Sequence, residues 1–198
     1  VQAVGHISIN VHDLGVDMLS ASAHKFNGPK GVGFLYIRNG IEILPYSDGG
    51  AQEFGLRAGT ENIAGIVGMA VALKNNRDAL EENVKHVREL ESMLVDMLDS
   101  TSIQYTRNGG ADILPGLVSL SFPGADGEAV LHRLDLRGIC VSTGSACNSK
   151  STEVSHVLQA IRLEDSYAKG TIRISLGKAN TEDDVEAIFK ALVKIFHI

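Results

Sequence analysis

The chain contains 198 residues, of which 44% are hydrophobic and 5% aromatic, and its formal net charge is -6 at pH 7. This length and composition suit one or two globular domains with a real core and exclude a disordered or fibrous protein. The acidic balance and the lack of basic clusters argue against nucleic acid or an anionic membrane surface as the main partner, and the longest uncharged run is far too short to span a membrane.

The cysteines and histidines predict neither a disulfide framework nor a metal site. Cys140 and Cys147 are the two cysteines, too few for the several bridges of a small secreted domain, and no signal-peptide pattern is present. His6 and His12 have no partner at metal-ligand spacing. We therefore expect a cytoplasmic location and no bound metal.

The first residue is Val1, and the pattern of residues 1–9 is typical of the entry into a strand that is already under way. We therefore expect the sequence to be a piece of a longer protein. Residues 13–15 supply turn chemistry before the next extended segment.

The segment SASAHKFNGPKGVG, which starts at Ser20, leads from a small-residue strand into a turn. If residues 19–24 form a strand, period-2 alternation places Ser20, Ser22 and His24 on one face. Lys25 then lies at the end of the strand, beside polar side chains. This is a suitable place for fixing a reactive amine.

A lysine in a polar pocket can bind an aldehyde cofactor covalently when desolvation or a neighbouring cation deprotonates part of its amine. Pyridoxal phosphate is the usual cofactor of this kind. The alternative is that Lys25 is an ordinary solvated surface charge, since the following GPKGVG lacks the spacing of a phosphate-binding P-loop. After this turn, residues 32–37 predict a second strand.

Residues 47–62, SDGGAQEFGLRAGTEN, are too polar and glycine-rich for a buried element and predict an ordered functional loop. Thr60 precedes a helical pattern that starts near Glu61, so it is expected to be the N-cap of that helix. A helix N-terminus with a hydroxyl group is also an anion site, and the two roles are compatible.

The helical pattern continues through Lys74, and a second amphipathic helix follows from Leu80, with apolar residues spaced three or four apart. The polar stretch between them, residues 75–79, predicts a domain boundary. We therefore expect one domain over residues 1–78 and a smaller one over residues 79–198.

The smaller domain is expected to be α+β. A final helix after Thr181 as N-cap would close its core. The other predicted elements are strands over residues 103–105, 118–122 and 172–176, a helix over residues 126–136, and a short strand over residues 139–141.

Two residues of this domain stand out for their chemistry. Cys147 lies in STGSACNSKST, where small polar residues predict a flexible, exposed loop, whereas Cys140 lies in an apolar segment and is expected to be an inert core residue. An exposed cysteine is either a nucleophile or accidental. Arg173 alternates with Ile172 and Ile174, so it projects from the face opposite these apolar side chains, usually as a surface charge.

Four motifs in order resemble those of the pyridoxal-phosphate-dependent cysteine desulfurases of the NifS/IscS type, in the class-V aminotransferase family. The resemblance spans essentially the whole chain. It implies an α/β fold: the C-terminal part of a pyridoxal-phosphate fold type I large domain, residues 1–78, followed by a small α+β domain, residues 79–198. The motifs are SASAHKFNGPKGVGFLYIR from Ser20, RAGTEN from Arg57, STGSACNS from Ser142 and TIRISLG from Thr171.

The resemblance also implies roles around the cofactor. Gln2 would lie near the cofactor's phenolic oxygen, Ser22 and His24 would hold its phosphate, and Lys25 would bind it covalently. The family's threonine at the position of Thr60 reaches the cofactor phosphate of the neighbouring subunit, which implies a homodimer with shared sites.

For the substrate, the resemblance implies that Arg173 binds the α-carboxylate of L-cysteine and that Cys147 attacks its sulfur. The products would be L-alanine and a Cys147 persulfide, which is passed to a sulfur-acceptor or iron-sulfur scaffold protein for cluster or thio-cofactor synthesis. A selenocysteine lyase or an aminotransferase of the same fold is an alternative, although an aminotransferase needs no cysteine nucleophile.

A third possibility is an incomplete fragment that has only folding or docking roles. The family's aspartate that pairs with the pyridinium nitrogen would lie just before Val1, and the upstream half of the site, with a histidine stacked on the ring and a phosphate-binding threonine, is also absent. We therefore expect the chain alone to be inactive and to bind little or no cofactor.

Overall fold

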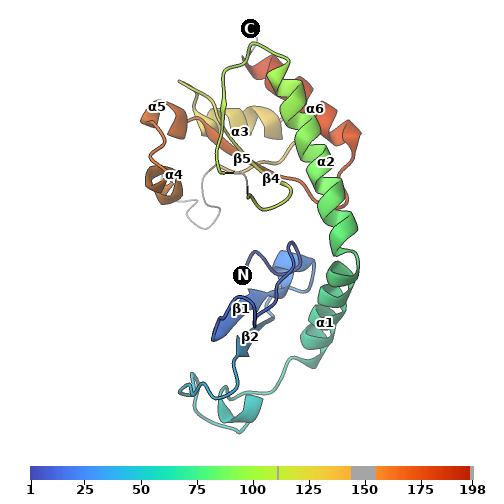
Figure 1. Ribbon diagram of the computed structural model, residues 1–198, viewed down its shortest axis with the longest axis vertical. Helices are drawn as coiled ribbons and strands as arrows, with labels where there is room; N and C mark the ends of the chain where they lie inside the picture. The colour runs from blue at the N-terminus through green and yellow to red at the C-terminus, as the bar shows by residue number, and fades with distance from the viewer. Residues whose placement is uncertain (111, 144–154, 197–198) are drawn as a thin grey trace. The chain divides into compact units, whose positions relative to one another are not determined.

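The computed structural model describes residues 1–110, 112–143 and 155–196. The chain divides into two compact units, residues 1–81 and 82–198, whose elements are labelled in Figure 1. None of the helices in these described ranges combines the length and apolarity that crossing a membrane requires.

The first unit is built on one antiparallel strand pair, β1 (Met18–Ser22) and β2 (Gly33–Ile37). The 3-10 helix η1 (Ala23–Phe26) follows β1 directly, so the predicted strand over residues 19–24 ends two residues early. A strand from residue 33 to 37 agrees with the second prediction. The small core of this unit consists of Val4, Ala21, Ala23 and Phe26, with α1 packed against it.

The segment before β1 does not form the expected strand. Residues 1–9 fold into turns with one isolated bridge between Val4 and Ile7. This correction has a local cause: Gly5 has a φ of +83°, a left-handed value that interrupts an extended segment. The turn predicted for residues 13–15 is present.

A long connection that contains the short 3-10 helix η2 (Glu53–Gly55) leads to helix α1 (Ile63–Asp78). Its N-cap is Asn62, whose side chain accepts a hydrogen bond from the backbone N–H of Gly65 at 3.0 Å. The prediction that Thr60 caps this helix is therefore wrong, because the helix begins two residues later than expected and Asn62, a stronger cap than threonine, precedes it.

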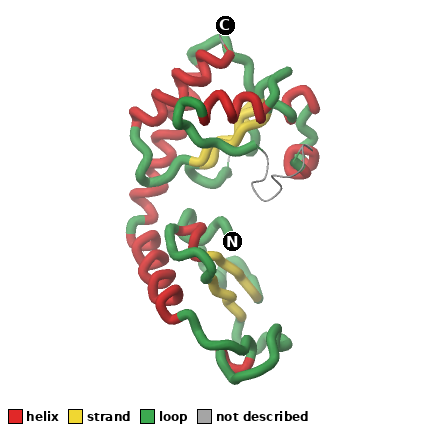
Figure 2. The backbone as a smooth tube through the Cα atoms, turned by 180° about the vertical axis from the view of Figure 1, so that it is seen from behind, coloured by secondary structure: helices red, strands yellow, loops and turns green. Residues whose placement is uncertain are grey.

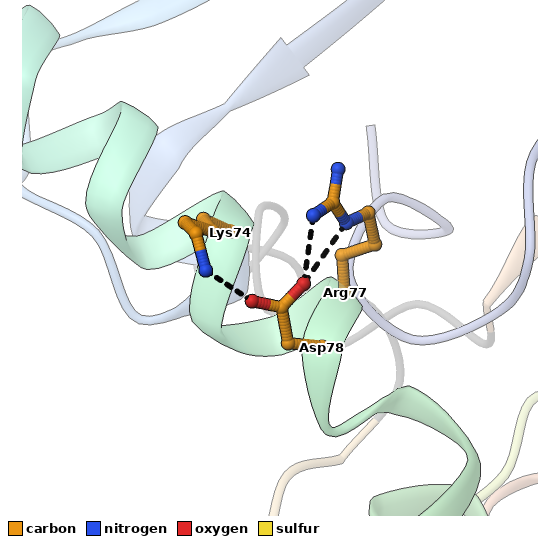
Figure 3. Close-up of polar contacts among 3 residues, drawn as sticks. All are labelled: Lys74, Arg77 and Asp78. Carbon is orange, nitrogen blue, oxygen red and sulfur yellow. Dashed lines mark hydrogen bonds and ion pairs between the residues drawn. The ribbon is translucent and has the colours of Figure 1, made fainter.

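Helix α1 runs through the polar stretch that was predicted to end it. Near its last turn, Asp78 forms ion pairs with Lys74 and with Arg77, the latter at 2.8 Å (Figure 3). The hydrogen bonds that Lys74 and Arg77 donate in these ion pairs hold the pKa of the Asp78 carboxyl below its usual range. All three side chains are exposed, so the cluster contributes little to stability.

The second unit contains a three-stranded antiparallel sheet in the order β3 (Thr106–Arg107), β4 (Leu117–Ser121) and β5 (Thr171–Ser175). Helices α2 (Leu80–Asp99), α3 (Gly127–Asp135) and α6 (Glu182–Phe196) supply most of the other apolar side chains of its core, and Figures 1 and 2 show helices beside the sheet. The strands contribute Val118, Leu120, Ile172 and Ile174, each at most 2% exposed.

The helix boundaries of this unit follow from their caps. Asp126 caps α3 by accepting from the N–H of Glu128 at 2.9 Å. At α6, the hydroxyl of Thr181, the predicted N-cap, accepts from the N–H of Asp184, and the Asp184 carboxylate accepts from the N–H of Thr181 at 2.9 Å, which together form a capping box.

Three predictions for this unit are wrong. The first strand covers residues 106–107 and not 103–105, and residues 139–141 form no strand. Ile139 and Val141 still pack against the core, whereas Cys140 between them is exposed. Alternation in an extended segment turns the middle side chain outward, so Cys140 is not a core residue. The short helices α4 (His156–Ala160) and α5 (Asp165–Ala168) had no predicted counterpart.

One buried carboxylate joins α2 to the sheet. The side chain of Glu91 is 6% exposed, forms an ion pair with Arg107 of β3, and accepts a hydrogen bond from the backbone N–H of Gly116 at 3.1 Å. A carboxylate buried to this degree needs both the ion pair and the hydrogen bond, because an unpaired carboxylate in the core is strongly unfavourable. Nearby, burial and a hydrogen bond to the Asp99 carboxylate raise the pKa of Tyr105.

Candidate functional site

The turn that carries Lys25 is the 3-10 helix η1. Ala23 and Phe26, three residues apart, are both 0% exposed, as the three-residue period of this helix requires for its inner side. Their burial leaves His24 exposed and Lys25 half-buried on the outer side. Asn27 closes the turn at a φ of +64°, a left-handed conformation that asparagine tolerates.

Ser22, His24 and Lys25 meet at the junction of β1 and η1. The expected alternation of Ser22 and His24 along one strand face is wrong, because His24 already belongs to the helical turn. Ser22 occupies the N-cap position of η1, yet its side chain makes no capping hydrogen bond. Within the described residues, none of the three side chains has a hydrogen-bond or ion-pair partner.

This donor set fits pyridoxal phosphate. A hydroxyl, an imidazole and an amine lie within four consecutive residues, and the buried side chains of Ala23 and Phe26 anchor the turn beneath them. The first two groups donate hydrogen bonds to phosphate oxygens, and a lysine amine is the group that binds an aldehyde. Because none of the three has a polar partner among the described residues, all three are available for a ligand.

Gln2 and Thr60, the two other predicted cofactor residues, are both exposed. Among the described residues, neither side chain has a polar partner. The loop that leads to Thr60 is ordered by internal contacts: Gly59 donates to the Gln52 side chain at 3.1 Å, and Ala58 donates to the backbone of Ser47 at 3.2 Å. Placement of Gln2 and Thr60 at the cofactor stays a prediction.

In the second unit, Arg173 occupies the position in β5 that its alternation predicts. Its neighbours Ile172 and Ile174 are 0% and 2% exposed, whereas Arg173 is half-buried. Its backbone is held from both sides: it lies opposite Ser119 of β4, and it exchanges two hydrogen bonds of 3.0 and 2.7 Å with Ser142.

Hydroxyl and amide groups share the sheet face of Arg173. Asn108 donates to the hydroxyls of Ser119 at 3.1 Å and Ser121 at 2.7 Å, and Ser121 hydrogen-bonds Thr171 at 2.7 Å. The Oδ1 atom of Asn108 is buried and has no partner among the described residues. A guanidinium on such a polar face is suited to a carboxylate. The alternating polar positions 119, 121, 171 and 173 were the sequence signal for this face.

Cys147 falls in residues 144–154, outside the described residues, so its predicted exposure and role stay predictions. The residues before this stretch are described and anchored. Ser142 pairs with Arg173, and the hydroxyl of Thr143 hydrogen-bonds the carboxylate of Glu128 in α3. Lys25 and Arg173 belong to different units, and their proximity also stays a prediction.

Comparison with known proteins identifies the family. Residues 1–188 match the family Aminotransferase class-V. The cysteine desulfurase IscS of Clostridium botulinum is 46% identical over 198 residues, covering 98% of this chain and 50% of that protein. The cysteine desulfurase IscS of Dictyoglomus turgidum is 45% identical, with the same coverage of both chains.

Solved structures of NifS-like proteins share the fold of this chain. A NifS-like protein from Rickettsia africae matches with a TM-score of 0.89 and 33% identity, over all of this chain and 52% of that one. A second NifS-like protein matches with a TM-score of 0.88 and 42% identity, over 98% of this chain and 50% of that one. The predicted α/β fold of pyridoxal-phosphate fold type I is thus confirmed, and the chain spans about half the length of the relatives it matches. The chain belongs to the aminotransferase class-V family.

Proposed function

We propose that the complete protein is a pyridoxal-phosphate-dependent cysteine desulfurase. It removes sulfur from L-cysteine and gives L-alanine and a persulfide on Cys147. The observation that carries the proposal is that Ser22, His24 and Lys25 lie together where β1 passes into η1, with no polar partner among the described residues, in a chain 46% identical to a cysteine desulfurase.

In this proposal, each residue of the first unit has a distinct task. Ser22 and His24 bind the phosphate of the cofactor, Gln2 contacts its phenolic oxygen, and Lys25 binds its aldehyde carbon. When bound, the cofactor supplies an electron sink for charge at the substrate Cα. The Lys25 amine, once displaced by substrate, carries the proton at Cα.

Arg173 and Cys147 act on the substrate. The planar fork of Arg173 holds the α-carboxylate through two parallel hydrogen bonds. The Cys147 thiolate attacks Sγ of L-cysteine, so that a sulfur–sulfur bond forms while the Cβ–Sγ bond breaks. The electron pair of the broken bond stays with the carbon skeleton, which takes up a proton and leaves as L-alanine.

The partners and location of the protein are also proposals. A homodimer would let Thr60 reach the cofactor phosphate of the neighbouring subunit, and its exposure is compatible with that role. The persulfide sulfur passes to an acceptor or iron-sulfur scaffold protein in the cytoplasm. We assign residues 1–78 to the cofactor-binding large domain and residues 79–198 to the small domain, which agrees within a few residues with the compact units.

We further propose that residues 1–198 alone are inactive and bind little cofactor. On α1, the apolar side chains of Ile63, Val67 and Val71 recur every four residues and are each more than half exposed. Tyr46 and Phe54 are almost fully exposed. Relatives of twice the length have additional chain that could cover such a surface.

The test is single-turnover persulfide formation by the complete protein with L-cysteine. Cys147→Ser is expected to abolish protein-bound persulfide. Cys140→Ser is the matched control, because Cys140 is an exposed thiol with no assigned role, and it should form persulfide at the parental rate. Persulfide formation at the parental rate in Cys147→Ser would refute the assignment.

A further inference from the structure

Asn76 is the one polar residue buried in the first unit, with 6% of its surface exposed. It lies near the end of α1, where asparagine is a poor helix former. A buried amide is tolerated only when its hydrogen bonds are made. The Asn76 Nδ2 group donates to the backbone carbonyls of Phe26 at 2.7 Å and of Ala72 at 2.8 Å.

The carbonyl of Phe26 belongs to the last residue of η1, the turn that carries Lys25. The final carbonyls of a helix lack partners within the helix. Here side chains from two other segments supply the missing donors. Asn76 donates to the carbonyl of Phe26, and His6 Nε2 lies 2.8 Å from the carbonyl of Lys25. The peptide planes on the C-terminal side of Lys25 are therefore both held.

Close packing adds to this hold. A Cβ atom at Gly5 would lie 2.6 Å from the Cβ of Phe26 and 3.6 Å from the Cβ of Asn76. The chain before His6 thus lies directly against the underside of the turn. The hydrogen bonds of His6 and Asn76 act on a backbone segment with little room to shift.

We propose that Asn76 and His6 are positioning residues for the Lys25 amine. The inference rests on the proposed function, in which Lys25 binds the cofactor. Neither side chain is assigned contact with cofactor or substrate. Their loss lets the turn move, which displaces the amine from the substrate Cα and slows proton transfer while leaving Arg173 and the binding of the carboxylate unchanged.

The experiment compares Asn76→Ala and Asn75→Ala in the complete protein loaded with pyridoxal phosphate. Asn75 is exposed on the same helix, so its variant makes the same chemical change without the contact. We expect Asn76→Ala to lower kcat by roughly 10-fold or more, with KM for L-cysteine within about 2-fold. The pH dependence of the visible absorbance of the lysine-bound cofactor should also shift. Asn75→Ala should match the parent in both.

His6 provides an independent variant pair if Asn76→Ala fails to fold. His6→Phe removes the donor to the Lys25 carbonyl, whereas His6→Gln keeps one. The glutamine variant is expected to recover most of the lost kcat. Parental kcat and absorbance in folded Asn76→Ala, or equal kcat in the two His6 variants, would overturn the inference.

A separate measurement tests the premise. Borohydride reduction of the parent and peptide mapping should place the cofactor on Lys25. If the parent has no label there, both the proposed function and the inference fail. If Lys25 is labelled in the parent but Asn76→Ala behaves like the parent, only the inference fails.

Discussion

Replacement of Glu91 tests the energetic account of the second unit. Glu91→Ala removes the acceptor of the buried Gly116 N–H and the ion-pair partner of Arg107. An unsatisfied buried N–H costs about 1–3 kcal/mol. The Arg107 side chain is 32% exposed and regains water, so we discount its loss to about 1 kcal/mol. The sum predicts a loss of about 3 kcal/mol in the free energy of unfolding.

Equilibrium urea unfolding followed by far-UV circular dichroism measures this change. Glu89→Ala is the matched control, since Glu89 lies on the same helix, is largely exposed and contacts Lys85 at only 3.8 Å. It should change stability by less than about 0.5 kcal/mol. Glu91→Gln keeps an acceptor for Gly116 and should lie between the two. A Glu91→Ala protein as stable as Glu89→Ala would refute the reasoning.

Three further predictions concern a glycine, a capping carboxylate and the arginine. Gly116→Ala should destabilise by more than about 2 kcal/mol in the same urea assay, because Gly116 has a φ of +79° and a Cβ would lie 2.4 Å from the carbonyl oxygen of Leu176. The hydrogen bond from the Thr181 backbone lowers the pKa of Asp184 below its ordinary 3.8, so its stabilisation is present above pH 3.8 and is lost as the pH falls through the lower folded value. Asp184→Asn should flatten the acid limb of a stability-against-pH curve, and an unchanged limb would contradict this. Arg173→Lys should raise the KM for L-cysteine about 10-fold in an alanine-production assay, because lysine keeps the charge but loses the fork; an unchanged KM would remove Arg173 from the carboxylate.

Elements with a strong local signal were predictable from the sequence. Strand β5 alternates Ile172, Arg173 and Ile174, and the structure buries the outer two. Helix α6 begins after a threonine followed by acidic residues, and the capping box is present at that position. In both cases the period and the cap depend on neighbouring residues alone, which is why single-sequence reasoning finds them.

Predictions failed where distant contacts decide the local structure. Cys140 has apolar neighbours, but Ile139 and Val141 both pack against a core formed by distant elements, and this turns the side chain between them outward. His24 continues the alternation of β1, yet the backbone turns into η1 because Ala23 and Phe26 both enter the core. Asn76 was part of a polar stretch predicted to end the helix, and its role depends on a carbonyl fifty residues earlier in the chain.

Some features of the candidate site could be predicted from the residues themselves, and others only from the family resemblance. The chemistry of a lysine beside a hydroxyl and an imidazole follows from residues 22–25, whereas the assignment to a cysteine desulfurase came from the resemblance of four motifs. The positions of Gln2, Thr60 and Cys147 at a shared site require chain packing that single-sequence reasoning does not supply, and they stay predictions.

The most direct test of the central claim is the identity of the lysine that binds pyridoxal phosphate. The complete protein is incubated with the cofactor, reduced with borohydride, digested and mapped by mass spectrometry. Lys30, exposed and five residues further along the chain, is an internal control for nonspecific reaction. We expect label on Lys25 and none on Lys30; equal label on both, or an unlabelled Lys25, would show that Lys25 is not the residue that binds the cofactor.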